Sequence, residues 1–243
     1  MTTEHIVKSF DDELRRLDNI IAEMGGIAEV QIADAIDGLI KRDVEQAERV
    51  IERDKRIDNL EHELDEFATT MLALRQPMAD DLRIIIAALK TAVVLERIGD
   101  YAKNIAKRTI ALSHSPPIGP TRTIVRMARL VQSMIKNVLD AYVNRDADKA
   151  EDVRQSDEEV DALHSSLFRE LLTYMMEDPR VIGAGTHLLF VAKNIERIGD
   201  HATNIAKNVH VLVHGFAPSE RRKKGDASSY TVVETNDSQE VAS

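Results

Sequence analysis

The sequence contains no cysteine and no tryptophan, and aromatic residues make up only 4% of its 243 positions. Without cysteine, disulfides, thiolate zinc sites, iron–sulfur ligation and cysteine nucleophiles are all excluded. The remaining composition, rich in aliphatic and charged residues, favours long helices packed by aliphatic side chains over a β-sandwich.

Long hydrophobic runs are also missing, and we expect no signal peptide at the start of this sequence. The longest apolar stretch, Ile84–Leu95, is interrupted by Lys90 and is shorter than the ~20 residues that a membrane span needs. The first twelve residues are charged and lack the apolar run of a signal peptide. We therefore expect a soluble, cytoplasmic protein. Its net charge of −10 argues against nucleic acid as a partner.

The apolar residues recur in alternating steps of three and four, which is the pattern of helices. This pattern predicts an all-α fold of two tandem three-helix bundles with long antiparallel helices. The bundles are expected at residues 1–112 and 121–215, joined by a Pro/Gly/Ser linker at 113–120. Residues 216–243 are expected to form a disordered polar tail, or alternatively a partner-docking arm. Apolar stripes or helices are predicted at 14–39, 50–71, 81–112, 121–144, 146–176 and 181–213.

The two halves repeat one another in sequence. Glu96–Lys107 matches Glu196–Lys207 at ten of twelve positions, and Asp37–Val50 matches Asp140–Val153 at six of fourteen, with an offset of 103. Such self-similarity at a fixed spacing indicates a tandem duplication.

Each half carries pairs of acidic residues spaced four apart, which places both members on one face of a helix. Residues equidistant from an antiparallel turn lie level, so Asp58 is expected beside Glu96, and Asp161 beside Glu196. The neighbouring apolar residues predict that the carboxylates point outward, forming one surface patch in each half. The pairs are Asp54 and Asp58, Glu96 and Asp100, Asp157 and Asp161, and Glu196 and Asp200.

Four carboxylates in one patch suit hard divalent or trivalent cations such as Mg²⁺, Mn²⁺ or iron, and we expect metal at both patches. The alternative is a solvated helix face neutralised by Arg97, Lys103 and Lys107. Gly99 and Gly199 stand mid-helix, where close helix packing explains them better than backbone access to the patch. His164 is expected to be an ordinary surface residue.

Nucleophile triads, Gly-rich phosphate loops and Walker sequences do not occur, so the sequence does not predict an enzyme. Three functional classes remain open at this stage. They are a metal-dependent carboxylate-bundle enzyme, a cation-storage protein and a purely structural coiled-coil adaptor.

Residues 5–215 resemble the PhoU family. The resemblance rests on the duplicated Glu-Arg-Ile-Gly-Asp helices, on the paired acidic motifs and on the segment Arg75–Arg83, which reads Arg-Gln-Pro-Met-Ala-Asp-Asp-Leu-Arg. The second half keeps only Asp178-Pro-Arg180 at the equivalent turn. If that turn docks a partner, the two halves are not expected to dock it equally.

The resemblance implies homodimers of paired three-helix bundles with metal at the acidic motifs. It also implies an accessory protein and negative regulator of phosphate uptake. Such a protein links the phosphate ABC transporter, through its ATPase subunit, to the sensor histidine kinase of the phosphate-starvation response. The expected mechanism is physical docking, which would bring the protein to the inner membrane through its partners.

Overall fold

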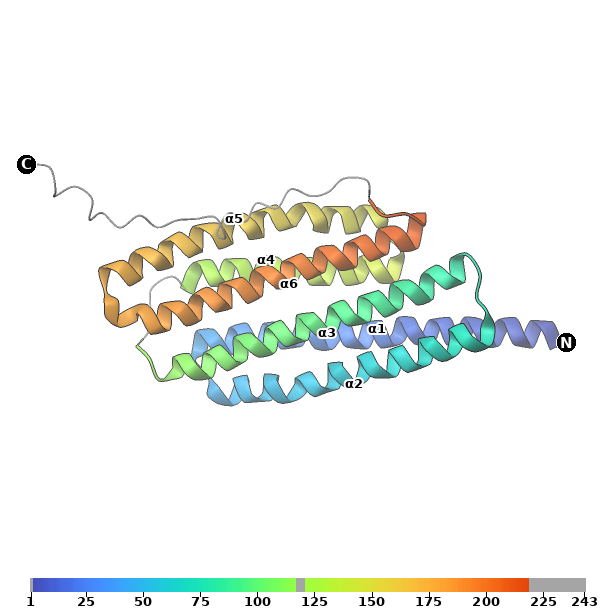
Figure 1. Cartoon of the computed structure of the whole chain (residues 1–243), viewed down its shortest axis with the longest axis horizontal. Coiled ribbons are helices and arrows are strands. Elements are labelled where there is room, and N and C mark those ends of the chain that lie inside the picture. The colour runs from blue at the N-terminus through green and yellow to red at the C-terminus, as the bar shows by residue number, and fades with distance from the viewer. Residues whose placement is uncertain (1, 117–120, 219–243) are drawn as a thin grey trace, which may run out of the picture.

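The computed structural model describes residues 2–116 and 121–218, and this part of the chain is almost entirely helical (Figure 1). The predicted all-α fold is confirmed, and the predicted helix ends agree closely with those observed from the third helix onward. Residues 117–120 of the predicted linker and residues 219–243 of the predicted tail lie outside the described residues. The elements are α1 Thr2–Lys41, α2 Val44–Arg75, α3 Asp80–Ser113, α4 Thr121–Asn144, α5 Ala147–Glu177, the short 3-10 helix η1 Pro179–Val181, and α6 Ile182–His214.

The first turn of each repeat is built in the same way. Arg42 and Arg145, which are 103 residues apart, both have positive φ, at 59° and 55°. The next residue, Asp43 or Asp146, accepts a hydrogen bond from the backbone N–H three residues on and so caps α2 or α5. The duplication seen in the sequence therefore extends to the backbone conformation of these turns.

The second turn of each repeat contains proline, as predicted. α2 ends at Arg75, and Gln76 and Pro77 separate it from α3. In the other repeat Asp178 caps η1, and Pro179 occupies the first position of that short helix. The α2–α3 and α5–α6 turns lie at opposite ends of the molecule (Figure 1).

The two repeats pack side by side with opposite direction. α3 packs against α6 along most of its length, and α1 packs against α4 (Figure 1). Tyr101 and His201 occupy the same position in the two repeats, and their rings stack with centroids 5.3 Å apart. Equivalent residues meet one another only on a two-fold axis, so an approximate two-fold relates the repeats.

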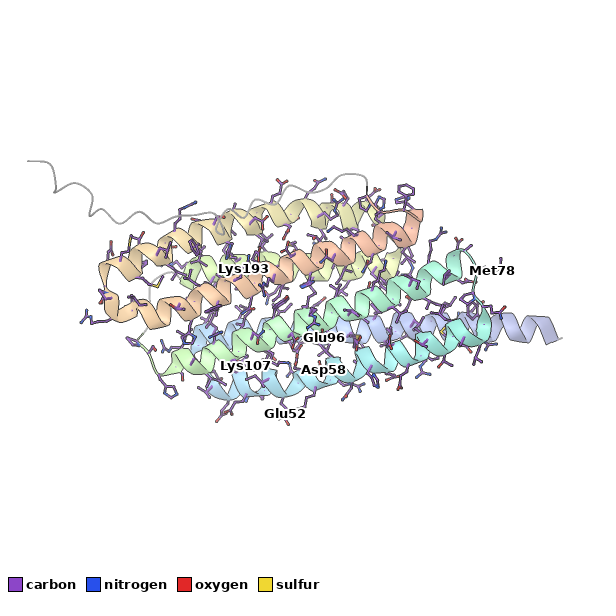
Figure 2. All side chains as sticks on the ribbon, viewed as in Figure 1. Glu52, Asp58, Met78, Glu96, Lys107 and Lys193 are labelled. Atoms are coloured by element: carbon purple, nitrogen blue, oxygen red, sulfur yellow. The ribbon has the colours of Figure 1, made fainter. Side chains whose placement is uncertain are left out.

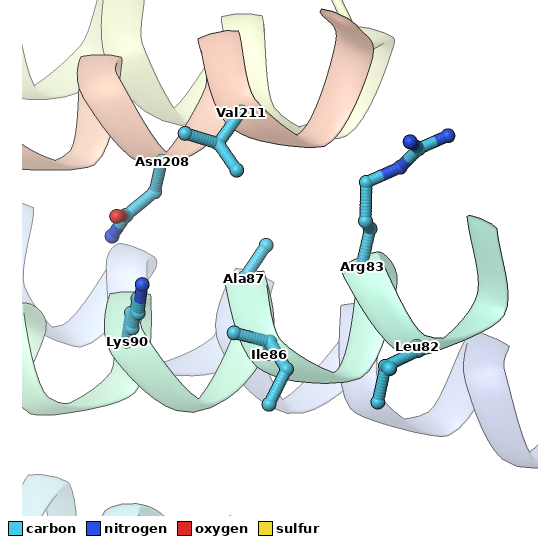
Figure 3. Close-up of a pocket in the computed structure, with 7 residues that line it drawn as sticks. All are labelled: Leu82, Arg83, Ile86, Ala87, Lys90, Asn208 and Val211. Atoms are coloured by element: carbon cyan, nitrogen blue, oxygen red, sulfur yellow. The ribbon is translucent and has the colours of Figure 1, made fainter. Parts of the chain in front are cut away.

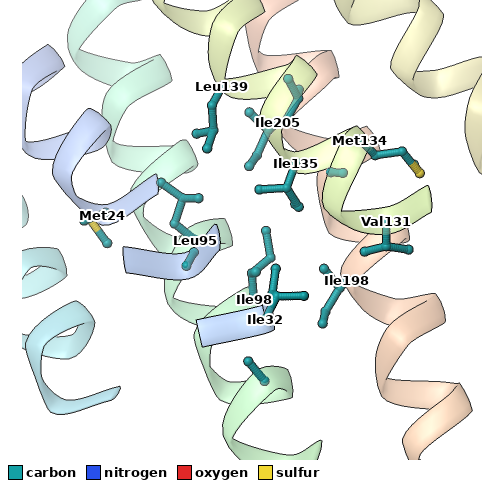
Figure 4. Packing of buried hydrophobic residues seen from close by; sticks show 14 of the residues in the cluster. Met24, Ile32, Leu95, Ile98, Val131, Met134, Ile135, Leu139, Ile198 and Ile205 are labelled. Carbon is teal, nitrogen blue, oxygen red and sulfur yellow. The ribbon is translucent and has the colours of Figure 1, made fainter. Parts of the chain in front are cut away.

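The hydrophobic core is continuous between the repeats. Met24 and Leu95 from the first repeat lie with Ile135, Ile198 and other side chains of the second in a single cluster (Figure 4). Each fully buried aliphatic side chain of this kind contributes roughly 1.5–3 kcal/mol to folding. The two three-helix bundles thus share their core and hold each other in fixed register. None of the helices among the described residues contains an apolar stretch long enough to cross a membrane.

Candidate functional site

The eight acidic residues lie at the middle of the bundle, and the prediction that they all line its surface is wrong. Half of them are buried: Asp54 and Glu196 are 2% exposed, and Asp157 and Asp161 are 1% exposed. Glu96, Asp100 and Asp200 are half-buried, and only Asp58 is exposed.

Helix periodicity explains the burial. In α2 the buried stripe runs through Val50, Asp54 and Ile57, so that Asp54 occupies a core position of the heptad pattern. In α5 the same stripe contains Asp157 and His164. A residue three positions before an apolar one lies only about 60° from it around the helix, which puts it on the same face rather than the opposite one.

The first cluster consists of Asp54, Asp58, Glu96 and Asp100 together with Lys103. The ammonium of Lys103 donates to Asp54 Oδ2 and also to Asp100 Oδ1, the latter at 2.7 Å. Asp58 on α2 lies level with Glu96 on α3, as the hairpin register predicted (Figure 2). A positive charge therefore already sits between two of the four carboxylates, and it comes from the chain itself.

The charges in this cluster shift one another's protonation. Burial, followed by the charge of Asp54, raises the pKa of Asp58; burial and Asp100 raise the pKa of Glu96. Burial alone would lower the pKa of Lys103, but its hydrogen bonds to Asp100 and Asp54 outweigh burial and raise that pKa. The same contact lowers the pKa of Asp100 although burial opposes it. Lys103 thus stays charged and keeps Asp100 ionised.

Gly99 allows the close approach that forms the first cluster. A methyl group on Gly99 would lie 3.0 Å from Ile57, 3.1 Å from Asp54 Oδ1 and 3.2 Å from Gln31 Oε1. Close packing, the explanation favoured by the sequence, therefore accounts for this glycine. Gln31 is fully buried, and its side-chain amide has no hydrogen-bond partner among the described residues.

The second cluster consists of Asp157, Asp161, Glu196 and Asp200, with different neighbours. Lys193 lies 3.0 Å from Glu196 Oε2, and burial raises the pKa of Glu196 although Lys193 partly offsets this. A methyl group on Gly199 would lie 2.7 Å from Asp157 Oδ1, so the approach of α5 to α6 is as close here as that of α2 to α3.

His164 belongs to the second cluster, so its predicted surface position is wrong. The imidazole is 3% exposed and lies close enough to Glu196 to affect its pKa. The signal in the sequence was its heptad position, seven residues after Asp157. The three-residue spacing of Lys103 to Asp100 and of Lys193 to Glu196 marks both lysines in the sequence as candidate partners of the carboxylates. The position of each ammonium group relative to the carboxylates could not be predicted from that spacing.

Equivalent positions in the two clusters carry different side chains. Thr203 stands where the first repeat has Lys103, and its hydroxyl donates to the backbone carbonyl of Asp200. Arg97 lies 3.4 Å from carboxylate oxygens of Glu96 and Asp100, whereas the Arg197 guanidinium lies over the Tyr101 ring. The first cluster therefore receives two cationic side chains from its own α3 segment.

The donor set of both clusters has the chemistry that hard cations require, namely carboxylate oxygens held close by a glycine. The second cluster adds an imidazole nitrogen, which suits manganese or iron better than magnesium. In the described part of the chain, however, no three Asp, Glu or His side chains converge as metal ligands do. The second cluster fits a metal in composition. In the first cluster, the Lys103 ammonium already contacts two of these carboxylates.

A separate surface lies at the end of the molecule that carries the α2–α3 turn. Leu74 and Met78 are 76% and 78% exposed there, and Leu82 is partly exposed. Beside the turn, between α3 and α6, is a cavity of about 200 Å³ (Figure 3). Its walls are mainly apolar, with two cationic groups at the rim. The residues that line the cavity are Leu82, Arg83, Ile86, Ala87, Lys90, Asn208 and Val211.

The molecule is thus a duplicated helical bundle with two acidic clusters at its middle and an exposed apolar turn at one end. The family model described as PhoU domain matches the chain twice, at residues 21–109 and 124–209. The chain therefore belongs to the PhoU family, and each match corresponds to one of the two repeats.

Similar proteins extend over nearly the whole chain. A Caulobacter vibrioides protein is 52% identical over 93% of this chain and 99% of its own length, and a Rhizobium meliloti protein is 48% identical over 94% and 97%. Both are named phosphate-specific transport system accessory protein PhoU homolog. These names describe accessory proteins rather than enzymes.

Two solved structures share the fold. The crystal structure of PhoU from Pseudomonas aeruginosa has a TM-score of 0.82 at 42% identity and covers 85% of this chain and 100% of that one. The regulatory protein PhoU from Streptococcus pneumoniae has a TM-score of 0.81 at 28% identity, with 87% and 100% covered. The six-helix arrangement is thus kept at low sequence identity.

Proposed function

We propose that this protein is an accessory protein and negative regulator of phosphate uptake and of phosphate-starvation signalling. The observation that carries the proposal is the 52% identity over 93% of the chain to a phosphate-transport accessory protein. The matched region includes both repeats and both acidic clusters, which are the parts of the molecule used in the proposals below.

The protein acts by docking to the ATPase subunit of the phosphate ABC transporter and to the sensor histidine kinase. When phosphate is plentiful, the docked protein restrains transport and holds the kinase inactive at the cytoplasmic side of the membrane. It does so as a homodimer, which sedimentation can test. Docking fits a chain whose described helices cannot cross a membrane, because such a protein reaches a transporter only through its surface.

We assign transporter docking to the α2–α3 turn. Leu74 and Met78 expose large apolar side chains on a turn braced by two long helices, and the turn lies within the family-specific segment Arg75–Arg83. Arg75 itself holds the turn to α1 through ion pairs with Glu13 at 2.5 and 3.0 Å. A rigid, exposed apolar surface of this kind supports association with another protein.

Cations at the acidic clusters hold each α-hairpin together. The carboxylates of Asp54, Asp58, Glu96 and Asp100 come from α2 and α3, and those of Asp157, Asp161, Glu196 and Asp200 come from α5 and α6. Without a cation, these like charges would repel one another across the hairpin. We propose Mg²⁺, Mn²⁺ or iron as the metals available to these carboxylates.

The test is a phosphate-starvation reporter in cells that lack this gene and grow with ample phosphate. We expect the reporter to be active, and the wild-type gene to silence it again. The variant Leu74→Ser/Met78→Ser should fail to silence it and should lose binding to the purified ATPase subunit. The matched control is Met176→Ser/Ile182→Ser, which changes exposed residues at the α5–α6 turn and should silence normally.

A reporter that stays inactive in the deletion strain contradicts the regulatory role. Normal silencing by a folded Leu74→Ser/Met78→Ser protein contradicts only the assignment of docking to the α2–α3 turn. Separate binding measurements with the ATPase subunit and with the cytoplasmic part of the kinase show which partner uses this surface.

A further inference from the structure

A cavity of about 200 Å³ lies between α3 and α6, beside the α2–α3 turn. An apolar cavity of roughly 150 Å³ is large enough for a benzene ring, whereas pockets for small-molecule ligands begin at about 300 Å³. Ala87 on α3 and Val211 on α6 point toward each other across the space (Figure 3). The cavity therefore fits a single aromatic side chain better than a free ligand.

The second repeat has an aromatic ring at the equivalent place. The approximate two-fold relates each residue of α3 to the residue of α6 that is 100 positions later. Ala87 in the cavity wall therefore corresponds to His187. Lys90 at the rim corresponds to Phe190. The Arg108 guanidinium lies 4.5 Å from the centroid of the Phe190 ring, and its Nη1 lies 3.2 Å from His187 Nδ1. The surface between α3 and α6 can thus hold an aromatic ring beside a cationic group.

The rim of the cavity is cationic. The Arg83 guanidinium donates to Asp80, whose side chain is 80% exposed. The Arg83 Nε–H has no hydrogen-bond partner among the described residues, and Lys90 is exposed. Hydrogen bonds to an ionised carboxylate are about twice as strong as those between neutral groups. The two cations therefore favour an occupant that carries a carboxylate near its aromatic ring.

The chain contains a segment with this chemistry after Pro218, the last residue that the structure describes. Tyr230 is the one aromatic residue in the sequence beyond that proline, and Glu234 follows it by four positions. Residues 226–243 carry four acidic residues and no lysine, arginine or histidine. The segment therefore complements both the apolar walls of the cavity and its cationic rim.

This segment begins close enough to the cavity to reach it. Helix α6 continues for only three residues beyond Val211, which lines the cavity, and Pro218 follows shortly after the end of that helix. The twelve residues from Pro218 to Tyr230 span at most about 40 Å. The distance back to the cavity is only about two turns of α6, at ~5.4 Å per turn. Tyr230 can therefore enter the cavity without full extension of the chain.

We propose that the segment Tyr230–Glu234 docks in this cavity, with the Tyr230 ring between α3 and α6 and the Glu234 carboxylate at the cationic rim. The segment belongs to the same chain, so its effective concentration at the cavity is high. One aromatic anchor and one ion pair are then sufficient to hold it in place.

The docked segment covers the side of α3 next to the α2–α3 turn, which is the surface assigned above to the transporter. The segment and the ATPase subunit therefore compete for this end of the molecule. This consequence rests on the proposed function, whereas docking of the segment itself does not depend on any partner.

The experiment traps the docked segment with a disulfide in the full chain, which has no cysteine of its own. In Leu82→Cys/Thr231→Cys, one cysteine lies at the cavity and the other follows Tyr230. We expect a disulfide within one chain under mild oxidation, measured by mass spectrometry of the linked peptides. The matched control is Ile182→Cys/Thr231→Cys. Ile182 is equivalent to Leu82, at the opposite end of the molecule, and is 48% exposed against 39%.

Two further changes test the anchor and the rim in the Leu82→Cys/Thr231→Cys protein. Tyr230→Ala and Lys90→Glu should each slow disulfide formation about tenfold, because each removes a major contact of the segment. Val241→Ala changes another apolar residue of the same acidic segment and should leave the rate unchanged. Circular dichroism verifies that each variant folds, and purified ATPase subunit added before oxidation should slow the reaction.

The outcomes separate this inference from the proposed function. Equal rates for the Leu82 and Ile182 pairs overturn docking in the cavity, and so does a rate that Tyr230→Ala leaves unchanged. A disulfide that joins two chains assigns the cavity to a second copy and also overturns docking within the chain. Trapping that the ATPase subunit does not slow contradicts the competition, whereas the regulatory role is tested independently by the reporter.

Discussion

The two repeats place an ion pair at the same position between their first and second helices, but with the charges exchanged. Glu23 on α1 pairs with Arg56 on α2 in the first repeat, and Arg126 on α4 pairs with Glu159 on α5 in the second. Each residue is 103 positions from its counterpart, and all four are well exposed. At these exposed positions, the ion pair can form with the acidic residue on either of the two helices.

The acidic clusters differ in a way that is not a simple exchange. The first has Lys103, Glu61 and Gln31 where the second has Thr203, His164 and Met134. Four carboxylates are kept in both, so the repeats differ in what neutralises them. The comparison teaches that the retained carboxylates have different cationic partners: Lys103 bridges α2 and α3 in the first repeat, whereas Lys193 pairs with Glu196 in the second.

The largest expected effect comes from removing the internal lysine. Lys103→Met leaves Asp54 buried without its ammonium partner, which should lower the free energy of unfolding by about 2–3 kcal/mol. Lys193→Met is the matched change in the other repeat. It should cost about 1 kcal/mol, because the Lys193 side chain is 36% exposed, against 22% for Lys103. Urea unfolding in EDTA measures both, and equal losses would contradict the distinction.

An added methyl group should be unfavourable both at Gly99 in the first cluster and at Gly199 in the second, with or without a bound cation. Gly99→Ala should destabilise the protein by about 1–2 kcal/mol, because the added methyl meets Ile57, Asp54 and Gln31 at 3.0–3.2 Å. Gly26→Ala is the control in the same repeat, since nothing lies within 4 Å of the added methyl. It should stabilise the protein by about 0.5–1 kcal/mol. A neutral or stabilising Gly99→Ala would contradict the close packing.

The imidazole of the second cluster should set its metal preference. His164→Asn should weaken Mn²⁺ binding about tenfold and Mg²⁺ binding much less, because nitrogen donors favour transition metals. Glu61→Gln alters the equivalent position of the first repeat and should leave Mn²⁺ affinity unchanged. Competition titrations of the two metals give both values, and equal losses for Mg²⁺ and Mn²⁺ would show that His164 is not a ligand.

The smallest effects are expected for the exchanged surface pairs. Glu23→Gln and Arg126→Gln should each change the free energy of unfolding by less than about 0.5 kcal/mol, because exposed ion pairs contribute little. Thermal unfolding at low and high salt is sufficient to measure them. A loss above about 1 kcal/mol in one repeat only would indicate that the surfaces are not equivalent.

Much of the fold could be predicted from the sequence, because it depends on local signals. Periodicity located the helices, proline and glycine marked the turns, and the self-similarity revealed the duplication. The hairpin register that set Asp58 level with Glu96 followed from distances to the turn. The antiparallel packing of the repeats could not be predicted in this way, because the contact between Tyr101 and His201 joins residues 100 positions apart.

The candidate site was predicted in its residues but not in its environment. Asp54 and Asp157 interrupt apolar heptads, so the sequence around them is consistent with either exposed or buried carboxylates. The placement of the Lys103 ammonium depends on a long, flexible side chain and on the approach of α2 to α3. The contrast between Lys103 and Thr203 is visible in the sequence, but its meaning requires the contact to Asp54.

The most direct measurement is anomalous diffraction at the manganese edge from crystals soaked in MnCl₂. A peak is predicted in each acidic cluster, beside Asp54 and Asp100 in the first and beside Asp157 and Glu196 in the second. Crystals without a manganese peak at either cluster would contradict the account, because the proposed cation binding would then have no site.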